Sequence, residues 1–494
     1  MKNILTTMKT LLVLLVLGSC SDSYLDVNVD PNNPITVSPN LILPVALNYT
    51  AGIEERDRGQ NHLGNMFMGA WSQSDGFSWY NDEFLYLVTP SFYQRIFDTT
   101  YGTVLKQYKG LEVLEGAEYG NYQAISKIMQ AMHFQILVDT YGDVPYSEAL
   151  QRGVNPTPKY DDAEAVYDGL IGQLTAAINL ISATADVTGA LVPSEDDGVF
   201  AGDMSKWKKF ANSLKLRILV RQSDLAGKAS YIQEQFSAIS AEGSGYMTDD
   251  VMINIGYSQT ESQQNPKWDG LGEDVSGTKT LTNNATCATP YVLARLTDTN
   301  DGRLNLLFEE PDTGHLGVVQ GLQEYDSPVV DQYVPDLVSN IGPGILRGPD
   351  QGAVIYTAAE AYFNLAEAAL KGFTSDDAQT MYESGITASF DYLGASGASA
   401  YYAQDIATVG WAASSNKLEA IIVQKWLGVM GINALQSWFD FNRTGYPSDV
   451  PMSLLSTKPN RPVRLSYPSS ELTANSNNLP TQQDVFSSKI FWAN

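Results

Sequence analysis

Apolar residues recur at spacings of three and four in six stretches of the chain, which is the period of an α-helix with one buried face. These stretches lie at residues 125–136, 163–181, 207–218, 359–370, 378–390 and 418–429. Ser205 precedes the third stretch and Ser375 the fifth, and we expect both to act as N-caps. Gly372 follows the fourth stretch, where a glycine commonly ends a helix. The pattern therefore predicts a mainly α-helical protein.

The predicted helices form two sets, at about 95–235 and about 355–445. In the second set, the stretches 356–371 and 376–393 are joined by a short loop and carry small residues where the two helices would touch. This pair is similar to a tetratricopeptide-type hairpin, although the strict 34-residue signature is absent. We expect stacked hairpins of this kind to form a helical scaffold.

Two further segments, at about 236–354 and about 446–494, are rich in Gly, Ser, Thr, Asn and Pro and show few periodic runs. Long irregular stretches in a large domain are usually functional loops. The predicted fold is therefore a tetratricopeptide-like helical hairpin scaffold with an irregular, loop-rich ligand-binding lobe. Both parts belong to a single domain at 41–494.

The first residues have the parts of a secretory signal peptide. Lys2 and Lys9 precede the apolar run 11–17, which is followed by Gly18-Ser19-Cys20. Seven apolar residues are too few to cross about 30 Å of hydrocarbon. The ending resembles a bacterial lipobox, which implies that residues 1–19 are removed and that Cys20 is lipidated; the alternative is an ordinary signal with a cysteine nearby. Residues 20–40 are polar and turn-rich, and we interpret them as a tether.

Composition limits the possible partners. The chain has 494 residues, of which 44% are apolar and 17% charged, and this is a globular composition. Acidic residues outnumber basic ones by 56 to 30, giving a net charge of −26, which disfavours nucleic acid as a partner. Two cysteines exclude a disulfide-stapled scaffold and a thiolate zinc site.

Motifs of common enzymes are absent from the sequence. His62, His133 and His315 do not have metal-ligand spacing, and no HExxH, GxSxG or Walker sequence occurs. We expect His133 to be a core residue of the first helix. The segment 298–302 is calcium-like in composition, but its glycine is one position early for an EF-hand loop, so we interpret it as a turn. We therefore expect no cofactor, no metal and no catalytic residue.

Neighbouring carboxylates occur at 54/55, 161/162, 196/197 and 309/310. A glycosidase needs two carboxylates about 5–9 Å apart across a cleft. In so acidic a chain, neighbouring acids are usually solvated surface groups. A secreted hydrolase on a helical scaffold nevertheless stays open as an alternative.

A series of motifs in a fixed order covers nearly the whole chain. After the lipobox they are DVNVDPNNP at 26–34, AMHFQILVDTYGDVPYSEAL at 131–150, WKKFANSLKLR at 207–217, AEAYFNLAEAALKG at 359–372, YESGITASF at 382–390, QKW at 424–426, RTGYP at 443–447 and RLSYPSSE at 464–471. In this order they resemble the SusD/RagB-like nutrient-binding outer-membrane lipoproteins of Bacteroidetes. One departure is position 442, where we expect a second arginine before Thr444 but find Asn. If the arginine pair normally forms a buried ion network, part of that network is missing.

The resemblance implies a lipid-anchored protein on the outer face of the outer membrane that caps a SusC-like TonB-dependent β-barrel transporter. Such a protein captures a nutrient, most often an oligosaccharide and sometimes a peptide, and releases it into the barrel. It therefore implies binding rather than catalysis. A peptide-binding lid of the same transporter, and a structural partner that braces the barrel without touching ligand, remain alternatives.

Aromatic residues between polar ones suit a sugar ligand, because a flat ring covers the apolar face of a sugar and polar neighbours bind its hydroxyls. The densest cluster is the segment 71–80, where we predict ligand contacts from Trp71, Asp75, Trp79 and Tyr80. Trp71 has an alternative interpretation as a core residue. A second polar run predicts contacts from Tyr257 and Trp268. By contrast, we expect the tryptophans on helix faces to pack in the core; these are Trp207, Trp426 and Trp438.

Overall fold

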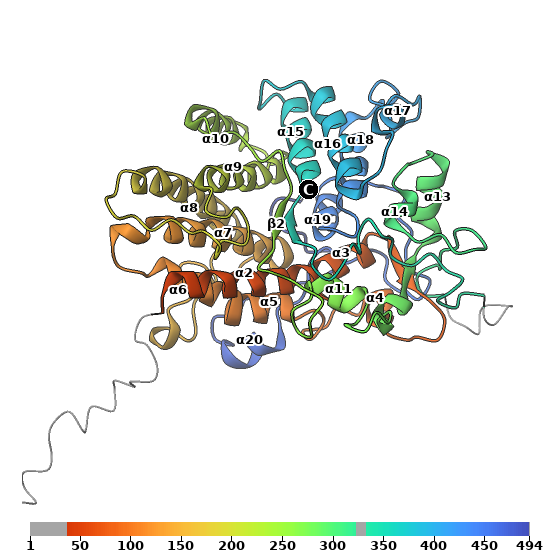
Figure 1. Ribbon diagram of the computed structural model, residues 1–494, viewed down its shortest axis with the longest axis horizontal. Coiled ribbons are helices and arrows are strands. Elements are labelled where there is room, and N and C mark those ends of the chain that lie inside the picture. Colours follow the sequence, from red (N-terminus) through yellow and green to blue (C-terminus); the bar gives the residue numbers. More distant parts are fainter. Residues whose placement is uncertain (1–36, 323–331, 494) are drawn as a thin grey trace, which may run out of the picture.

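The computed structural model describes residues 37–322 and 332–493, and most of its regular structure is helical (Figure 1). The α-helices are α2 (Pro39–Glu55), α3 (Gln60–Phe67), α4 (Asn81–Leu85), α5 (Arg95–Thr99), α6 (Lys106–Glu112), α7 (Gly120–Tyr141), α8 (Ala163–Thr184), α9 (Met204–Arg221), α10 (Ala229–Glu242), α11 (Pro266–Leu271), α12 (Leu281–Ala285), α13 (Pro290–Asp298), α14 (Leu304–Leu307), α15 (Ala358–Leu370), α16 (Ala378–Leu393), α17 (Ala398–Tyr402), α18 (Lys417–Val429), α19 (Leu435–Thr444) and α20 (Ser469–Ala474). Three other helical turns are η2 (Thr100–Leu105), η3 (Ala117–Tyr119) and η4 (Arg152–Val154). The strands are β1 (Trp71–Gln73), β2 (Val251–Ile253), β3 (Thr286–Ala288) and β4 (Ala353–Tyr356).

The six predicted helices are confirmed as α7, α8, α9, α15, α16 and α18. Gly372 has a φ of +79° just beyond α15, as expected for a residue that ends a helix. The two predicted N-caps are wrong by two positions, because the carboxylates of Asp203 and Asp377 accept the free N–H groups at the starts of α9 and α16. In both places an ionised oxygen is a stronger acceptor for these groups than the serine hydroxyl.

The scaffold is built from helical hairpins. α7 packs on α8, α8 on α9, and α15 on both α16 and α18, so the predicted tetratricopeptide-like arrangement is confirmed (Figure 1). Gly385 shows how closely α16 approaches α15, since a Cβ at this position would lie 2.8 Å from the ring of Phe363. Trp207, Trp426 and Trp438 are buried as expected, at exposures of 0%, 2% and 0%.

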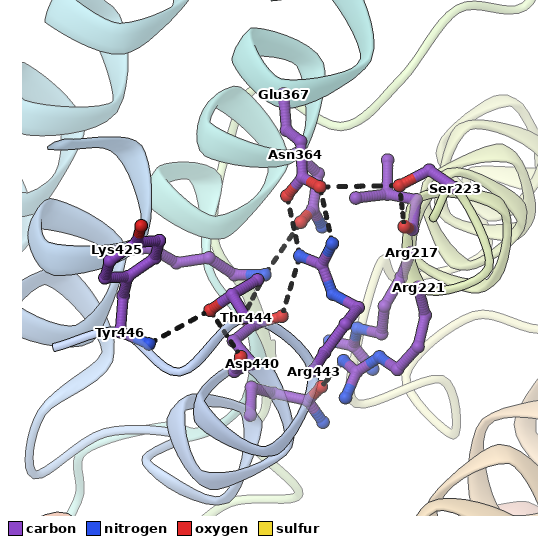
Figure 2. Close-up of polar contacts among 12 residues, drawn as sticks. Arg217, Arg221, Ser223, Asn364, Glu367, Lys425, Asp440, Arg443, Thr444 and Tyr446 are labelled. Carbon is purple, nitrogen blue, oxygen red and sulfur yellow. Dashed lines mark hydrogen bonds and ion pairs between the residues drawn. The ribbon is translucent and has the colours of Figure 1, made fainter. Parts of the chain in front are cut away.

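A buried ionic network joins four of the scaffold helices (Figure 2). Arg443 of α19 donates to both carboxylate oxygens of Glu367 in α15, at 2.6 and 2.7 Å. Lys425 of α18 lies 2.8 Å from Asp440 of α19. Burial alone would raise the pKa of Glu367, but Arg443 and Lys371 outweigh it and lower the pKa to about 2.

The network extends to α9 through a second buried pair. Arg217 donates to both oxygens of Glu360 in α15, at 2.6 and 2.8 Å. The family resemblance leads us to expect a second arginine at position 442. The side-chain amide of Asn442 instead donates a hydrogen bond to the carbonyl oxygen of Val463, at 3.1 Å. Arg443 thus takes part in the network without a second arginine at the preceding position of the chain.

The segments predicted to form the irregular lobe contain only short elements, apart from the end of α10, which reaches residue 242. β1 pairs antiparallel with β3, aligning Trp71 with Ala288 and Gln73 with Thr286. β2 pairs antiparallel with β4, which leads directly into α15. The first of these pairings brings residues of the first hundred next to the middle of the chain.

The apolar periodicity did not predict α2. α2 runs along the base of the hairpin stack in Figure 1 and packs on α6, β4 and α11. It begins at Pro39, so the predicted tether ends two residues inside it. Cys20 and the rest of the predicted signal lie outside the described residues. Across the described part of the chain, no helix combines the length and the hydropathy needed to span a membrane.

Candidate functional site

The segment after β1 forms a loop that is closed by one side chain. Gln73 accepts hydrogen bonds from the backbone N–H groups of Trp79 and Tyr80, at 2.7 and 3.0 Å, through its side-chain oxygen. Its amide nitrogen donates to the carbonyl oxygen of Phe77 at 2.5 Å. Gly76 sits at the tip with a φ of +89°. The hydrogen bonds of the Gln73 side-chain amide therefore take the place of backbone–backbone hydrogen bonds and fix the shape of the loop.

The far side of the loop is attached to the middle of the chain. The Ser74 hydroxyl donates to the carbonyl oxygen of Asn284 at 2.6 Å, and the Asp75 N–H donates to the carbonyl oxygen of Tyr333 at 2.8 Å. Asp75 also accepts from the Tyr333 N–H at 3.3 Å. The half-buried Asp75 is thus held at a junction between the loop and the irregular lobe.

Two of the predicted contact residues lie in the core instead. Trp71 is 1% exposed and packs edge-on against His62, with 5.6 Å between ring centroids. Tyr80 is fully buried, and its hydroxyl lies 2.8 Å from that of Thr286. Neither ring offers a face to a ligand, so the prediction for these two residues needs correction. The core interpretation of Trp71 agrees with its burial.

The loop borders a cavity of about 340 Å³. Its lining combines one aromatic ring of the loop, Phe77, with the polar side chains of Gln73, Asp75, Ser78 and Asn81. Phe84, Leu322 and Leu455 add apolar groups to the lining. Trp79 is half-buried and packs edge-on against Phe77 at 4.9 Å between centroids. Amide, carboxylate and hydroxyl groups next to an aromatic ring are the groups that a sugar ligand needs.

The end of α2 positions the two other predicted aromatic residues. The buried carboxylate of Glu55 lies 3.2 Å from the buried ammonium of Lys267 and accepts from the Asn265 amide at 3.1 Å. Asn265 caps α11 by accepting from the N–H groups of Lys267 and Trp268, at 2.9 and 3.1 Å. Half-buried Trp268 is therefore carried on a short helix that is attached to α2 by an internal ion pair.

Tyr257 lies near the same helix end but is buried, at 8% exposure. Burial raises the pKa of its hydroxyl, and the negative charge of Glu55 raises this pKa further. The hydroxyl has no hydrogen-bond partner among the described residues. The structure thus brings the segments of Trp79, Trp268 and Tyr257 to one end of α2, although the Tyr257 ring faces inward. The prediction of a ligand contact for Tyr257 is corrected accordingly.

Arg58 connects this helix end to the aromatic loop. Its guanidinium donates to the carbonyl oxygen of Trp79 at 2.8 Å. Burial alone would raise the pKa of the adjacent Asp57, but His62 and Arg58 outweigh it and hold the pKa below its usual value. Nothing local in the sequence pointed to Arg58, because its backbone conformation and its distant partner are set by the fold.

The histidines and carboxylate pairs have structural partners. His133 is fully buried, its ring lies 3.0 Å from the Thr50 hydroxyl, and burial lowers its pKa to about 3. Asp197 accepts from the Trp207 indole at 2.8 Å, and Asp301 of the calcium-like segment binds Arg303 at 2.6 Å. In residues 37–322 and 332–493, no group of three or more His, Cys, Asp or Glu side chains is arranged to hold a metal ion.

The first and third carboxylate pairs are also part of the folded structure. Glu54 and Glu55 are 4% and 1% exposed, and Asp196 accepts from the Tyr122 hydroxyl at 2.8 Å. The second and fourth pairs are engaged as well, Asp162 as the N-cap of α8 and Glu309 with Lys279 at 2.7 Å. These contacts stabilise helices and turns.

A stacked-hairpin scaffold that carries a loop lobe with a polar, aromatic-lined cavity defines a class of helical ligand-binding proteins. Residues 31–468 match the profile of a SusD-like family that is described as starch-binding and associating with the outer membrane. The chain belongs to this family. Comparison with curated protein sequences gave no match.

Solved structures share the fold. A chitin-binding protein superimposes with a TM-score of 0.73 at 23% identity, over 92% of this chain and 100% of the other. A chitin-binding SusD homologue from Flavobacterium johnsoniae gives 0.75 at 21% identity, over 92% and 98%. A SusD homologue from Bacteroides vulgatus gives 0.75 at 22% identity, over 92% and 97%. At these identities the similarity establishes the fold of the scaffold and lobe.

Proposed function

We propose that this chain is a cell-surface lipoprotein that captures an oligosaccharide and delivers it, chemically unchanged, to a SusC-like TonB-dependent transporter. The observation that carries the proposal is the cavity beside the loop of residues 73–81. There, the Phe77 ring lies next to amide, carboxylate and hydroxyl side chains, and Trp79 packs against that ring. The family description and the chitin-binding relatives support a glycan as the ligand.

The site is suited to binding a neutral or polar sugar surface rather than an apolar molecule. A sugar ring would cover Phe77 or Trp79 with its C–H face, and its hydroxyls would exchange bonds to water for bonds to Asp75, Ser78 and Asn81. Because the Gln73 amide already holds the loop closed, little conformational entropy is lost when ligand binds. The arrangement therefore favours reversible capture.

Calorimetry on the mature chain tests this function. Titration with a panel of oligosaccharides and peptides is expected to give saturable heat for a glycan, and chromatography of the same mixture is expected to return it intact. Saturation by peptides alone would identify a peptide-binding lid. Release of a shorter product, abolished by one carboxylate substitution, would identify a hydrolase. Heat from no compound of a broad panel would contradict capture.

Anchoring and delivery need their own measurement, since Cys20 lies outside the described residues. Metabolic labelling with palmitate is expected to mark the wild-type chain, and Cys20→Ser to abolish the label. Protease added to intact cells is expected to digest the labelled protein, because it faces the exterior. Co-purification with a β-barrel transporter is expected for the anchored form; a label-free chain in the periplasm would contradict the account.

A further inference from the structure

A second, smaller cavity of about 170 Å³ lies where α5 and α11 pack against α2. Three arginines line it: Arg56 and Arg58 from the turn after α2, and Arg95 from the start of α5. The rest of the lining mixes polar, apolar and small residues; they are Asn48, Tyr49, Gly52, Ile53, Asp57, Gly59, Thr99, Thr103 and Pro266. These elements lie together in the lower middle of Figure 1.

The cavity is lined mainly by positive charge, whereas the protein as a whole is negatively charged. Three arginines and one acid, Asp57, line the cavity, in a chain where 56 acids outnumber 30 bases. Asp57 is itself ionised beside His62, whose ring nitrogen lies 3.2 Å away. The side chains of Arg56 and Arg95 make no hydrogen bond or ion pair with any described residue. The cavity is therefore cationic and retains unused donors.

The fold fixes one of the arginines, Arg58, by a hydrogen bond and places a second, Arg56, against α2. The Arg56 side chain turns back over Gly52, with its Nε 3.9 Å from the point where a Cβ on that glycine would lie. Arg58 adopts a left-handed backbone conformation with a φ of +54° and donates to the Trp79 carbonyl at 2.8 Å. An arginine in this conformation is uncommon, and it persists only where surrounding contacts determine it. Here the contact is with the proposed sugar-binding loop.

The cavity also adjoins aromatic faces. Pro266 of its lining begins α11, which carries the half-buried Trp268, and the N–H nitrogen of Asp57 lies 3.3 Å from the position of a Cβ on Gly270 in the same helix. Tyr49 in the lining is 41% exposed. A ligand in this cavity would thus have an aromatic ring beside its charged group.

We propose that the Arg56–Arg58–Arg95 cavity binds the anionic group of an acidic oligosaccharide, a uronate carboxylate or a sulfate ester. This inference rests on the proposed function and names the ligand class. Guanidinium groups match both anions through paired N–H donors. A volume of about 170 Å³ admits one charged substituent with part of its sugar ring, so the remaining sugars extend towards Trp79 or Trp268.

The test compares oligogalacturonide with its methyl ester, in which a methyl group on each carboxylate removes the negative charge. The wild-type chain is expected to bind the acid at least tenfold more tightly, equivalent to about 1.4 kcal/mol. The preference is expected to shrink in 0.5 M NaCl, because exposed charges are screened there. A chondroitin sulfate hexasaccharide and the same hexasaccharide without its sulfate esters, titrated beside neutral maltohexaose and chitohexaose, distinguish sulfate recognition from carboxylate recognition, because both chondroitin probes keep their uronate carboxylates.

The double variant Arg56→Gln/Arg95→Gln is expected to lose the preference for the acid. Both side chains are exposed, so their replacement leaves the core intact. The matched control is Lys159→Gln/Lys206→Gln, which removes two exposed positive charges elsewhere and is expected to keep the preference.

Each result decides the matter. Tight binding of an acidic probe that the double variant weakens tenfold and the control does not supports the inference. Equal affinity for acid and ester, binding of the neutral oligosaccharides alone, or acidic binding that the double variant leaves unchanged overturns it while glycan capture stands. Silence towards every oligosaccharide overturns both the inference and the proposed function.

Discussion

The guanidinium of Arg58 donates a 2.8 Å hydrogen bond to the carbonyl oxygen of Trp79, across 21 positions of the chain. Arg58 does so from a turn that follows Glu55, the residue that anchors the helix carrying Trp268 through Lys267. Two residues, Glu55 at the end of α2 and Arg58 in the turn after it, thus position both half-buried tryptophans of the proposed site. Because α2 itself packs in the scaffold, it gives the segments that carry Trp79 and Trp268 a fixed support.

Gln73→Ala is expected to loosen the aromatic loop without unfolding the protein. The substitution removes the acceptor of the Trp79 and Tyr80 N–H groups and the donor to Phe77. Unsatisfied buried groups cost about 1–3 kcal/mol, so exchange at these two amides is expected to accelerate at least tenfold in hydrogen-exchange measurements. Gln483→Ala, at an exposed glutamine, is the control. Unchanged exchange in the Gln73 variant would show that this amide does not hold the loop.

Glu367→Gln is expected to destabilise the fold by about 3–5 kcal/mol, because it leaves the buried Arg443 guanidinium without its carboxylate. The wild-type pKa of Glu367 is about 2 and its ordinary value is 4.5. A lowered carboxyl pKa stabilises the fold above the ordinary value, and this stabilisation is lost as pH falls from about 4.5 towards about 2. Urea unfolding at several pH values measures both effects.

The matched control for Glu367 is Glu309→Gln, which breaks the exposed pair with Lys279. Its effect is expected to stay within about 1 kcal/mol, as for other surface ion pairs. If the Glu367 variant lost no more stability than this control, the network in Figure 2 would not be a stabilising element of the scaffold.

Glu54→Gln is expected to protect the protein against alkaline pH. Burial raises the pKa of Glu54 to about 8, with Arg217 opposing the shift and Glu55 and Glu360 adding to it. The Gln60 amide, which lies 3.1 and 3.0 Å from its two oxygens, is its hydrogen-bond partner. A carboxyl group with a raised pKa contributes its full stabilisation of the fold only below about pH 4.5. This stabilisation is lost as pH rises through about 8, and the loss is on the order of 4 kcal/mol at pH 9.

Thermal unfolding of wild type and the Glu54 variant at pH 6 and pH 9 measures this effect. The wild-type protein is expected to lose more of its midpoint temperature between the two pH values than the variant, in which position 54 cannot ionise. Parallel losses in both proteins would contradict the assignment of a neutral carboxyl to Glu54.

The sequence predicted the scaffold because a buried helix face repeats every 3.6 residues, and that signal is local. It did not predict α2, which contains Pro44 and whose exposed face also carries apolar residues, Leu41, Val45 and Tyr49. The motifs that carried the family resemblance include Arg217, Glu367, Lys425 and Arg443, all members of the buried network. They therefore specify the fold and do not identify a ligand.

The site was harder to predict, because its geometry depends on distant pairings. Whether an aromatic residue of 71–80 faces inward is decided by the pairing of β1 with β3, which lies more than two hundred positions away. That pairing buries Trp71, and the Thr286 contact buries Tyr80, whereas Trp79 remains half-buried. The arginines of the small cavity were missed for the same reason, since only the fold brings Arg95 to the turn after α2.

The central claim, glycan capture at the aromatic loop, is tested most directly by calorimetry of Trp79→Ala beside Trp411→Ala. Trp411 is also half-buried but packs in a separate cluster with Tyr382, so it controls for loss of a tryptophan. Stacking on an aromatic ring is worth roughly 1 kcal/mol or more. The account predicts that the Trp79 variant binds the captured oligosaccharide about tenfold more weakly while the Trp411 variant matches wild type; equal affinities of all three proteins would contradict it.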